Sequence, residues 1–394
     1  MVLPSLPSID RRLKLTILWL LVLLLAIDGA LQFAALINFQ PLGVDFLPLW
    51  TAGDMAWSHP GQVYDFAAVS RAQSWLLPNL HWSRPYAYPP TALLVLAPFG
   101  KLPFWPSLTL WVALGCGVFL YAGSRLTGRR LGLSLCLMAL SPAVLVAASV
   151  GQPVLPAAGL MVLAMVELER RPRLAGALMA LAAAIKPQVA LLAPVALIAG
   201  GSFDVLISAA VVEAILVAAS VALFGPARWS EWFASLPAFE ALVERTPGLL
   251  PCMITPNSAA QLLGLTGPAA TLWRAFFGLF GVALVWRAFA KGSGSGVAAR
   301  LGALSAGSLL ATPYAMNYDG TLLVAAAVAM VIESLEQRGW VLRLLALCAV
   351  CKLNATYIGL PVVLAFAVLS SFRVKLAPLE EPGPSLAPVT LPAS

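Results

Sequence analysis

The sequence contains little charge. Of its 394 residues, 10% are charged and 60% are hydrophobic. Soluble domains carry about 25% charged residues, which keep their surfaces in water. The composition therefore excludes an ordinary soluble domain and indicates a chain that lies mostly in a lipid bilayer.

Residues that build metal centres and disulfide frameworks are also scarce. The only two histidines, His59 and His81, lie in one loop, and no His, Asp or Glu cluster has the spacing of metal ligands. The sequence thus indicates no cofactor, and a requirement for a metal ion stays open. The five cysteines show no framework spacing, which excludes a disulfide-based fold. No run of Lys and Arg is interleaved with aromatic residues, so we expect no nucleic-acid partner.

Long apolar runs, in contrast, are abundant. A helix needs about 20 apolar residues to cross the ~30 Å hydrocarbon core of a bilayer. The first run, 15–38, follows Arg11, Arg12 and Lys14 and is longer than the ~7–15 apolar residues of a signal peptide, so we expect an uncleaved helix. Further runs follow at about 104–124, 131–150, 153–168, 173–186, 188–200, 205–224, 269–289, 297–311, 320–334, 341–352 and 355–371. We predict an all-α polytopic membrane protein with a bundle of roughly 10–13 transmembrane helices, several of them short and interrupted by proline.

Lys and Arg are unevenly distributed between the turns that join these runs. If the runs alternate in direction, 16 of the 24 Lys and Arg residues fall on the side of the N-terminus and 8 on the other side. The positive-inside rule places the richer side in the cytoplasm. Two long loops, about 40–103 and 225–268, then lie outside the cytoplasm, where we expect them to carry short amphipathic helices. We assign residues 1–375 to one membrane domain and the Pro- and Ser-rich segment 376–394 to a disordered cytoplasmic tail.

A few polar residues stand at the outward ends of the apolar runs. An ionisable group at such a position costs several kcal/mol unless it finds a partner or a wet cavity, so each is a functional candidate. Asp45 is the first acid after the first helix, and Lys186 is a lone cation beside apolar residues. The plainer alternatives are that Asp45 only caps a local helix over 46–57 and that Lys186 only reaches the outer headgroups.

Seven short motifs occur along the chain in an order that resembles a known family. They are Asp45-Phe46, Tyr64-Asp65, Tyr88-Pro89-Pro90, Gly151-Gln152, Lys186-Pro187, Asn257-Ser258 and Pro313–Asp319. Together they resemble glycosyltransferase family 87, the polyprenol-phosphate-mannose-dependent mannosyltransferases of the GT-C type, over most of residues 10–335. The chain departs from the family's pattern at Pro153, after the Gly-Gln pair, and at Ser258, after the Asn of the second loop.

The resemblance implies a GT-C-like bundle in a bacterial plasma (inner) membrane, with both termini in the cytoplasm and the active site outside it. It implies a polyprenyl-phosphate-linked sugar as the donor, a lipid or glycan hydroxyl as the acceptor, and transfer of a hexose with inversion. Mannose is the family's usual sugar. The expected partners are therefore these two substrates and the membrane lipids.

The chemistry of such a transfer can be assigned to residues. A phosphate ester leaves without a proton, so a single carboxylate acting as general base suffices, and Asp45 matches the family's acidic position. The departing phosphate gains negative charge, which cations and hydrogen-bond donors stabilise. We predict that the donor phosphate is bound by Lys186, Gln152, Arg84 and Tyr88. We predict that the sugar or the acceptor is bound by Asn257, Tyr314, Tyr318 and Asp319.

Two other classes of membrane protein compete with this interpretation. One is a twelve-helix secondary transporter, because the basic loop 123–130 is similar to that of the major facilitator type. That class expects two matching halves joined by a long cytoplasmic linker, whereas the middle cytoplasmic turn is only 200–204. The other is a non-catalytic, flippase-like lipid-binding protein. Long outward loops that carry an acid favour an enzyme over both.

Overall fold

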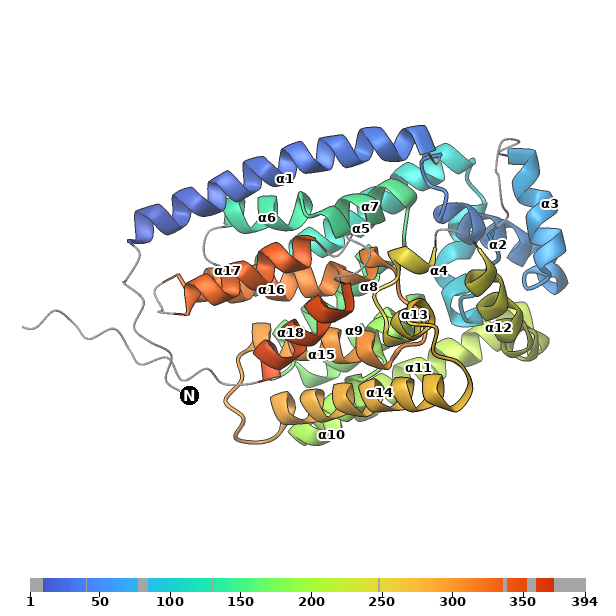
Figure 1. The fold of residues 1–394 in the computed structure, drawn as a ribbon. Coiled ribbons are helices and arrows are strands. Elements are labelled where there is room, and N and C mark those ends of the chain that lie inside the picture. The colour runs from blue at the N-terminus through green and yellow to red at the C-terminus, as the bar shows by residue number, and fades with distance from the viewer. Residues whose placement is uncertain are drawn as a thin grey trace, which may run out of the picture.

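The computed structural model describes residues 10–39, 41–76, 84–128, 131–246, 249–335, 339–352 and 359–371. Within these residues the chain forms α-helices and short 3₁₀-helices, with one isolated β-bridge between Met253 and Met316. The all-α class of a polytopic membrane protein is thereby confirmed (Figure 1). The predicted tail, 376–394, lies outside the described residues.

The bundle is built from helices that coincide with the predicted apolar runs. They are α1 (Arg11–Phe39), α5 (Phe104–Thr127), α6 (Leu131–Ala139), α7 (Pro142–Val150), α8 (Val154–Glu167), α9 (Pro172–Ile185), α10 (Ala193–Gly200), α11 (Phe203–Phe224), α14 (Gly267–Phe289), α15 (Val297–Ala311), α16 (Thr321–Glu333), α17 (Trp340–Cys351) and α18 (Gly359–Ser371). Two 3₁₀-helices, η2 (Pro187–Ala190) and η4 (Asn317–Gly320), precede α10 and α16. In Figure 1, α1 lies along α6 and α7 at one side of the bundle, and α14 lies at the opposite side.

The helices of the bundle differ widely in length. Within the described residues, α1, α5, α11 and α14 are long and apolar enough to cross a membrane. The pair α6 and α7 would make a fifth span, although it is bent by 60° at the break between the two helices. Other apolar helices have 10–17 residues, such as α8, α9 and α15. Short helices were expected from the sequence, and the number of crossings, roughly 10–13, stays a prediction.

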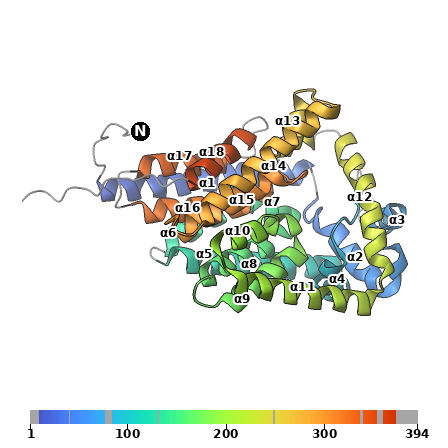
Figure 2. The same ribbon diagram turned by 90° about the horizontal axis from the view of Figure 1, so that it is seen from below.

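Short helices of the two long loops cover one end of the bundle (Figure 2). The first loop forms α2 (Phe46–Ser58), η1 (Pro60–Gln62), α3 (Phe66–Leu76) and α4 (Pro90–Gly100). The second loop forms α12 (Ala227–Arg245), η3 (Leu250–Cys252) and α13 (Pro256–Leu262). Glycines let α2 and α4 pack backbone to backbone, because a Cβ atom at Gly53 would lie 2.4 Å from the carbonyl oxygen of Leu96.

Helix α12 of the second loop touches the first loop and the segment between α15 and α16. Its Trp232 Nε1 donates a hydrogen bond to the carbonyl oxygen of Ala87 in the first loop, at 3.1 Å. Farther along the helix, the ring of Phe239 packs edge-on against Tyr314, which follows α15, with the ring centroids 5.6 Å apart. The helix therefore connects the first loop to the segment between α15 and α16.

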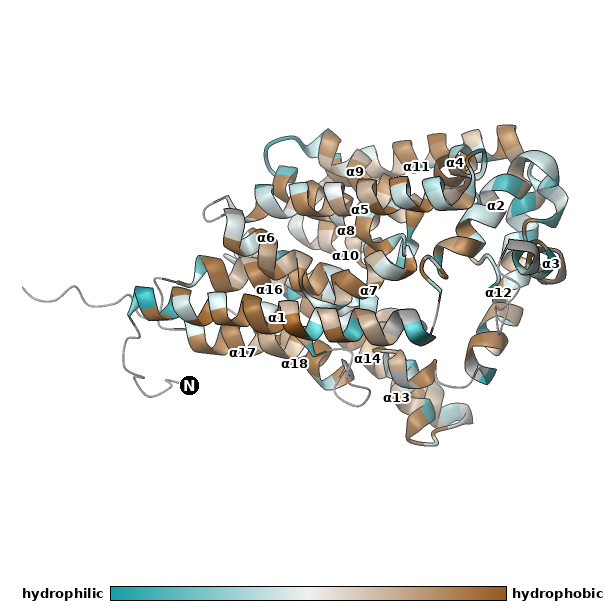
Figure 3. Cartoon of the chain, turned by 90° about the horizontal axis from the view of Figure 1, so that it is seen from above, coloured by the Kyte–Doolittle hydropathy of each residue, from teal (hydrophilic) through white to brown (hydrophobic). Residues whose placement is uncertain are grey.

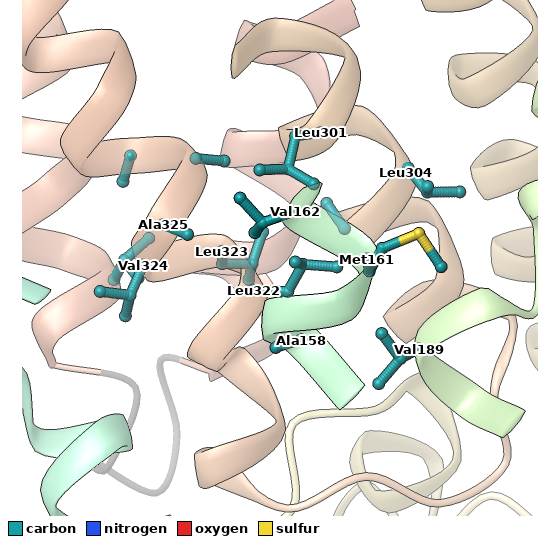
Figure 4. Packing of buried hydrophobic residues seen from close by; sticks show 14 of the residues in the cluster. Ala158, Met161, Val162, Val189, Leu301, Leu304, Leu322, Leu323, Val324 and Ala325 are labelled. Atoms are coloured by element: carbon teal, nitrogen blue, oxygen red, sulfur yellow. The ribbon is translucent and has the colours of Figure 1, made fainter. Parts of the chain in front are cut away.

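The packed interior is apolar and rich in small side chains. Helix α16 lies at its centre, and Leu322 through Ile332 are all buried. Figure 4 shows Leu322 and Leu323 of α16 beside Val162 of α8, with Leu301 of α15 close by. A separate, smaller cluster lies under the first loop, where Phe46 stacks on Trp111 with ring centroids 5.6 Å apart. That cluster supports the start of α2, where Asp45 lies.

The outer helices present apolar side chains outward. Leu31 of α1 is 68% exposed, and Leu272 and Leu279 of α14 are 71% and 70% exposed. Hydrophobic residues also run along the exposed length of α1 in Figure 3. Large apolar side chains exposed over whole helices suit hydrocarbon as the surrounding solvent.

The turns predicted to be cytoplasmic gather at the end opposite the long loops (Figure 1). Ion pairs join several of them: Arg125 Nη2 lies 3.2 Å from Glu167 Oε1, and Arg300 Nη1 lies 3.0 Å from Glu169 Oε1. The arrangement agrees with alternating helix directions. The assignment of this end to the cytoplasm rests on the positive-inside rule and stays a prediction.

Candidate active site

The backbone around Asp45 is fixed to the end of α7. The Gly43 N–H donates to the carbonyl oxygen of Ser149, and the Asp45 N–H donates to that of Val150, both at 2.9 Å. Asp45 stands at the N-cap position of α2, but its side chain makes no capping hydrogen bond. The interpretation of Asp45 as only a helix cap is therefore wrong, because its carboxylate faces other partners.

Both carboxylate oxygens of Asp45 are engaged. Arg84 Nη1 forms an ion pair with Oδ1, and Gln152 Nε2 donates a hydrogen bond to Oδ2 at 2.6 Å. The Asp45 side chain is 8% exposed, so its charge is compensated by direct contacts rather than by bulk water. Arg84 is less buried, with 21% of its side chain exposed.

Gln152 is the centre of the site. It follows Gly151, whose φ of +74° ends α7 in the left-handed region and turns the chain toward Asp45. The amide nitrogen of Gln152 donates to Asp45 and also to the Tyr318 hydroxyl at 2.9 Å. Its amide oxygen accepts a hydrogen bond from Lys186 Nζ at 3.3 Å. One side-chain amide thus joins the acid, the phenol and the lysine.

Lys186 points into the protein. It follows the last residue of α9 and is 4% exposed, and its Nζ lies 2.5 Å from Asp319 Oδ1. The same ammonium lies 5.3 Å from the centre of the Tyr318 ring, within the range of a cation–π contact. The alternative that Lys186 only reaches the outer headgroups is wrong. Asp319 is held in turn, because its Oδ2 accepts the Met316 N–H at 2.8 Å.

These five side chains form a continuous set, which we name the charge network. Its members are Arg84, Asp45, Gln152, Lys186 and Asp319. The network holds two cations and two carboxylates, joined by one neutral amide. Its members come from the first loop, the end of α7, the end of α9 and the start of η4. All five were predicted as site residues from the sequence, and the structure brings them together.

The predicted tyrosines surround the network. Tyr318 accepts a hydrogen bond from Gln152 and forms another with Tyr314. Burial raises the pKa of Tyr318, and the nearby Asp45 carboxylate raises it further. Burial also raises the pKa of Tyr88 and of Tyr314, with smaller contributions from Asp319 and Asp45. The three phenols therefore keep their protons at neutral pH and can donate hydrogen bonds.

Asn257 lies in a neighbouring segment. Residues 253–256 run beside 313–316, since the Ile254 N–H donates to the carbonyl oxygen of Ala315 at 3.1 Å. Asn257 is buried at the start of α13, but none of the described contacts joins its side chain to the charge network. Its role as a sugar or acceptor ligand stays a prediction.

One residue of the site was missed in the sequence. Gln73 of α3 is fully buried, and its amide makes two hydrogen bonds with the backbone of Arg84. The available signal was its spacing, because Gln73 falls on the same helix face as Phe66 and Val69. A polar residue on the inward face of an amphipathic helix needs a buried partner.

A metal centre is not apparent in the described part of the chain. No group of three or more His, Cys, Asp or Glu side chains comes together there as metal ligands would. The positive charge of the site comes from Arg84 and Lys186.

Comparison with known families identifies the chain. The model of glycosyltransferase family 87 matches residues 86–313, which is more than half of the sequence. The chain belongs to glycosyltransferase family 87. This confirms the resemblance seen in the motifs and makes the protein a membrane glycosyltransferase, which sets aside the transporter and flippase alternatives. No curated protein and no solved structure matches it significantly.

The family match and the charge network overlap in part. The part of the chain that matches the family, residues 86–313, contains Gln152 and Lys186 of the network, and also Tyr88 and Asn257. Asp45, Arg84 and Asp319 lie outside the matched range. Asp45 and Asp319 contact Gln152 and Lys186 inside it, and Arg84 contacts Asp45. The geometry therefore extends the site beyond the part of the chain that the family match covers.

Proposed function

We propose that this glycosyltransferase moves a hexose, in the first place mannose, from a polyprenyl-phosphate donor to a hydroxyl of a lipid or glycan acceptor, with inversion. The observation that carries the proposal is the charge network. In it the buried carboxylate of Asp45 contacts one cation, Arg84, and is linked through Gln152 to a second cation, Lys186. This set matches the demands of a phosphate leaving group and a hydroxyl nucleophile.

In the proposed reaction, the bond between the anomeric carbon and the phosphate oxygen breaks, and the phosphate keeps the electron pair. Arg84 and Lys186 stabilise the charge that develops on the phosphate, with Gln152 and the Tyr88 hydroxyl as hydrogen-bond donors. The acceptor oxygen attacks the anomeric carbon from the opposite face, which inverts its configuration. Asp45 takes the proton of the acceptor hydroxyl, a contribution worth roughly 10²–10⁴-fold.

The contacts within the network suggest how the donor changes the site. Before the donor binds, Asp45 and Asp319 occupy the places beside the two cations that a phosphate would take. A bound phosphate competes for the guanidinium of Arg84, whose side chain is long and partly exposed. Movement of Arg84 toward the phosphate leaves Asp45 Oδ1 open to the acceptor. Asn257, Tyr314, Tyr318 and Asp319 would then contact sugar or acceptor hydroxyls.

The proposed reaction takes place on the extracytoplasmic side of a bacterial plasma (inner) membrane. The charge network lies at the end of the bundle that carries the long loops, and Lys and Arg are sparse in those loops. The positive-inside rule supports cytoplasmic N- and C-termini. The partners are the polyprenyl-phosphate sugar, the acceptor and membrane lipids, with no nucleic acid.

The decisive test is transfer from radiolabelled polyprenyl-phosphate sugars by the purified protein, followed by identification of the product. We expect Asp45→Asn to lower the rate of transfer at least about 100-fold, because the amide cannot act as a base. The matched control is Asp54→Asn, an exposed acid of α2 outside the network, which should transfer normally. Transfer by a folded Asp45→Asn protein at the wild-type rate would reject the proposal.

A further inference from the structure

Gln73 is a buried polar residue that the proposed reaction does not use. We propose that Gln73 is a positioning residue, which fixes the backbone of Arg84 so that its guanidinium reaches both Asp45 and the donor phosphate. The inference rests on the proposed function, in which Arg84 binds that phosphate.

Within the part of the chain that the structure describes, the hydrogen bonds of the Gln73 side chain are directed at Arg84. Its Nε2 donates to the carbonyl oxygen of Arg84 at 2.6 Å, and its Oε1 accepts the Arg84 N–H at 3.0 Å. The side chain is 0% exposed, so both halves of the amide depend on these two bonds. Together they hold the Arg84 peptide groups in the way that a neighbouring β-strand would.

Helix α3, which presents Gln73, is itself anchored. Asp65 Oδ1 accepts the N–H groups of Ala67 at 2.9 Å and Ala68 at 3.2 Å, which caps the start of the helix. Val69, one turn before Gln73, is fully buried. The position of the Gln73 amide is therefore set by packing and by the cap.

The segment that follows Arg84 is held by other contacts. The carbonyl oxygen of Ala87 accepts a hydrogen bond from Trp232, and that of Tyr88 accepts one from the Tyr64 hydroxyl at 2.9 Å. Neither contact reaches Arg84 itself. Among the described contacts, those of Gln73 thus fix the backbone of Arg84 itself.

This arrangement separates a rigid backbone from a movable side chain. The Arg84 guanidinium is partly exposed and pairs with Asp45, whereas its peptide groups are clamped by a buried amide. The guanidinium can then pass from Asp45 to the phosphate by side-chain rotation alone. Pre-organised cations bind better because less ordering entropy is lost on binding.

The test replaces Gln73 by methionine, which keeps the size of the side chain and removes both hydrogen bonds. Without these two bonds the backbone of Arg84 is no longer fixed, so we expect donor kcat/KM to fall about tenfold. The acceptor KM should stay within about twofold of wild type. Gln73→Glu keeps an acceptor for the Arg84 N–H and should give an intermediate donor kcat/KM. The matched control, Gln62→Met, alters an exposed glutamine of η1 and should behave as wild type.

A double-mutant cycle distinguishes positioning from general support of the fold. In an Arg84→Ala background no guanidinium remains to be positioned, so Gln73→Met should change donor kcat/KM less than about twofold. A full tenfold effect in that background would overturn the inference, as would equal losses for donor and acceptor in Gln73→Met itself. If Gln73→Met does not fold, the same comparison is made with Gln73→Glu.

The failure of this inference can be told apart from failure of the proposed function. A wild-type protein that transfers sugar from no polyprenyl phosphate, or an Arg84→Ala protein with normal donor kcat/KM, contradicts the proposed function. Wild-type and Arg84→Ala proteins that behave as proposed, together with a Gln73→Met protein that matches Gln62→Met, contradict only the role of Gln73.

Discussion

The charge network holds its four charged residues in two ion pairs, Arg84 with Asp45 and Lys186 with Asp319, which Gln152 joins. A buried charge that loses its partner destabilises a protein by about 3–5 kcal/mol, whereas removal of both partners costs much less. Substitutions in the network therefore alter stability as well as chemistry. Experiments on single residues need variants that separate the two effects.

Lys186 allows such a separation. Lys186→Met leaves Asp319 buried without its cation, so we expect it to lower stability by about 3–5 kcal/mol and donor kcat/KM at least about tenfold. The double variant Lys186→Met/Asp319→Asn should recover most of the stability, measured as the apparent Tm in detergent, but not the donor kcat/KM. Lys186→Arg should retain part of the donor kcat/KM because it keeps the charge.

The control for Lys186 is Lys101→Met, which removes an exposed lysine that follows α4 in the first long loop and should change neither quantity. A double variant as unstable as Lys186→Met would show that the ion pair is not the source of the loss. Unchanged donor kcat/KM in Lys186→Met would reject its contact with the phosphate.

At the residue scale, the sequence predicted which polar side chains come together better than how they pair. Asp45 and Lys186 stood out because ionisable groups beside apolar runs need a reason to be there. Their partners lie 39 and 133 positions away, in Arg84 and Asp319, and no local pattern encodes a contact at that separation. Gln73 was missed because its spacing places it on the inward face of α3 but gives no indication of its partner, Arg84.

At the scale of elements, the end of α7 requires glycine at position 151. Gly151 has a φ of +74°, and a Cβ atom there would lie 2.6 Å from Phe46 Cβ and 2.9 Å from Leu108 Cδ1. Both the backbone conformation and the close contact call for glycine. Because Gln152 is the next residue, any shift of this turn moves the centre of the charge network.

Gly151→Ala is therefore expected to lower stability and transfer together. The left-handed conformation costs alanine about 1–2 kcal/mol, and the overlap adds about 1–3 kcal/mol. Gly128→Ala is the matched control: its φ is also positive, at +52°, but within the described residues no atom lies within 4 Å of the added Cβ. The difference between the two apparent Tm values measures the effect of the close contact at Gly151. Equal losses of Tm in the two variants would show that the contact contributes nothing.

The run 131–150 shows what the element pattern could not predict. It reads as one continuous apolar span, but the structure divides it into α6 and α7, bent by 60°. Pro142 is the first residue of α7, where a missing N–H is tolerated. Proline cannot donate the hydrogen bond that would continue α6 through this position. Hydrophobicity marked the segment as buried in lipid or protein, and only the tertiary packing fixes the bend.

At the scale of the whole molecule, the main prediction is the orientation of the protein in the membrane. In a protein whose five natural cysteines are replaced by alanine, a cysteine at Gln62 should react with a membrane-impermeant thiol reagent in intact cells. A cysteine at Arg170 should react only after the cells are opened. Both residues are exposed, and the turns that carry them, between α2 and α3 and between α8 and α9, lie at opposite ends of the bundle. The reverse labelling pattern would overturn the assigned orientation.

The overall architecture was largely predictable, because each apolar run except 131–150 corresponds to one bundle helix, and the turns rich in Lys and Arg lie at the end opposite the long loops. The distribution of Lys and Arg carries that information along the whole chain. The number of crossings was less accessible, since helices such as α8, α9 and α15 are too short to be recognised as spans by composition alone.

The contacts of α12 have a consequence for substrate selectivity. Trp232 bonds to the residue before Tyr88, and Phe239 packs on Tyr314 seven residues later along the same helix. One helix, which contains Pro237 between the two contacts, thus touches the segments of Tyr88 and Tyr314, the residues that we propose for the donor phosphate and for the sugar or acceptor. A substitution that shifts this helix to admit a bulkier acceptor would also move the segment of Tyr88, so we expect acceptor and donor preferences to change together.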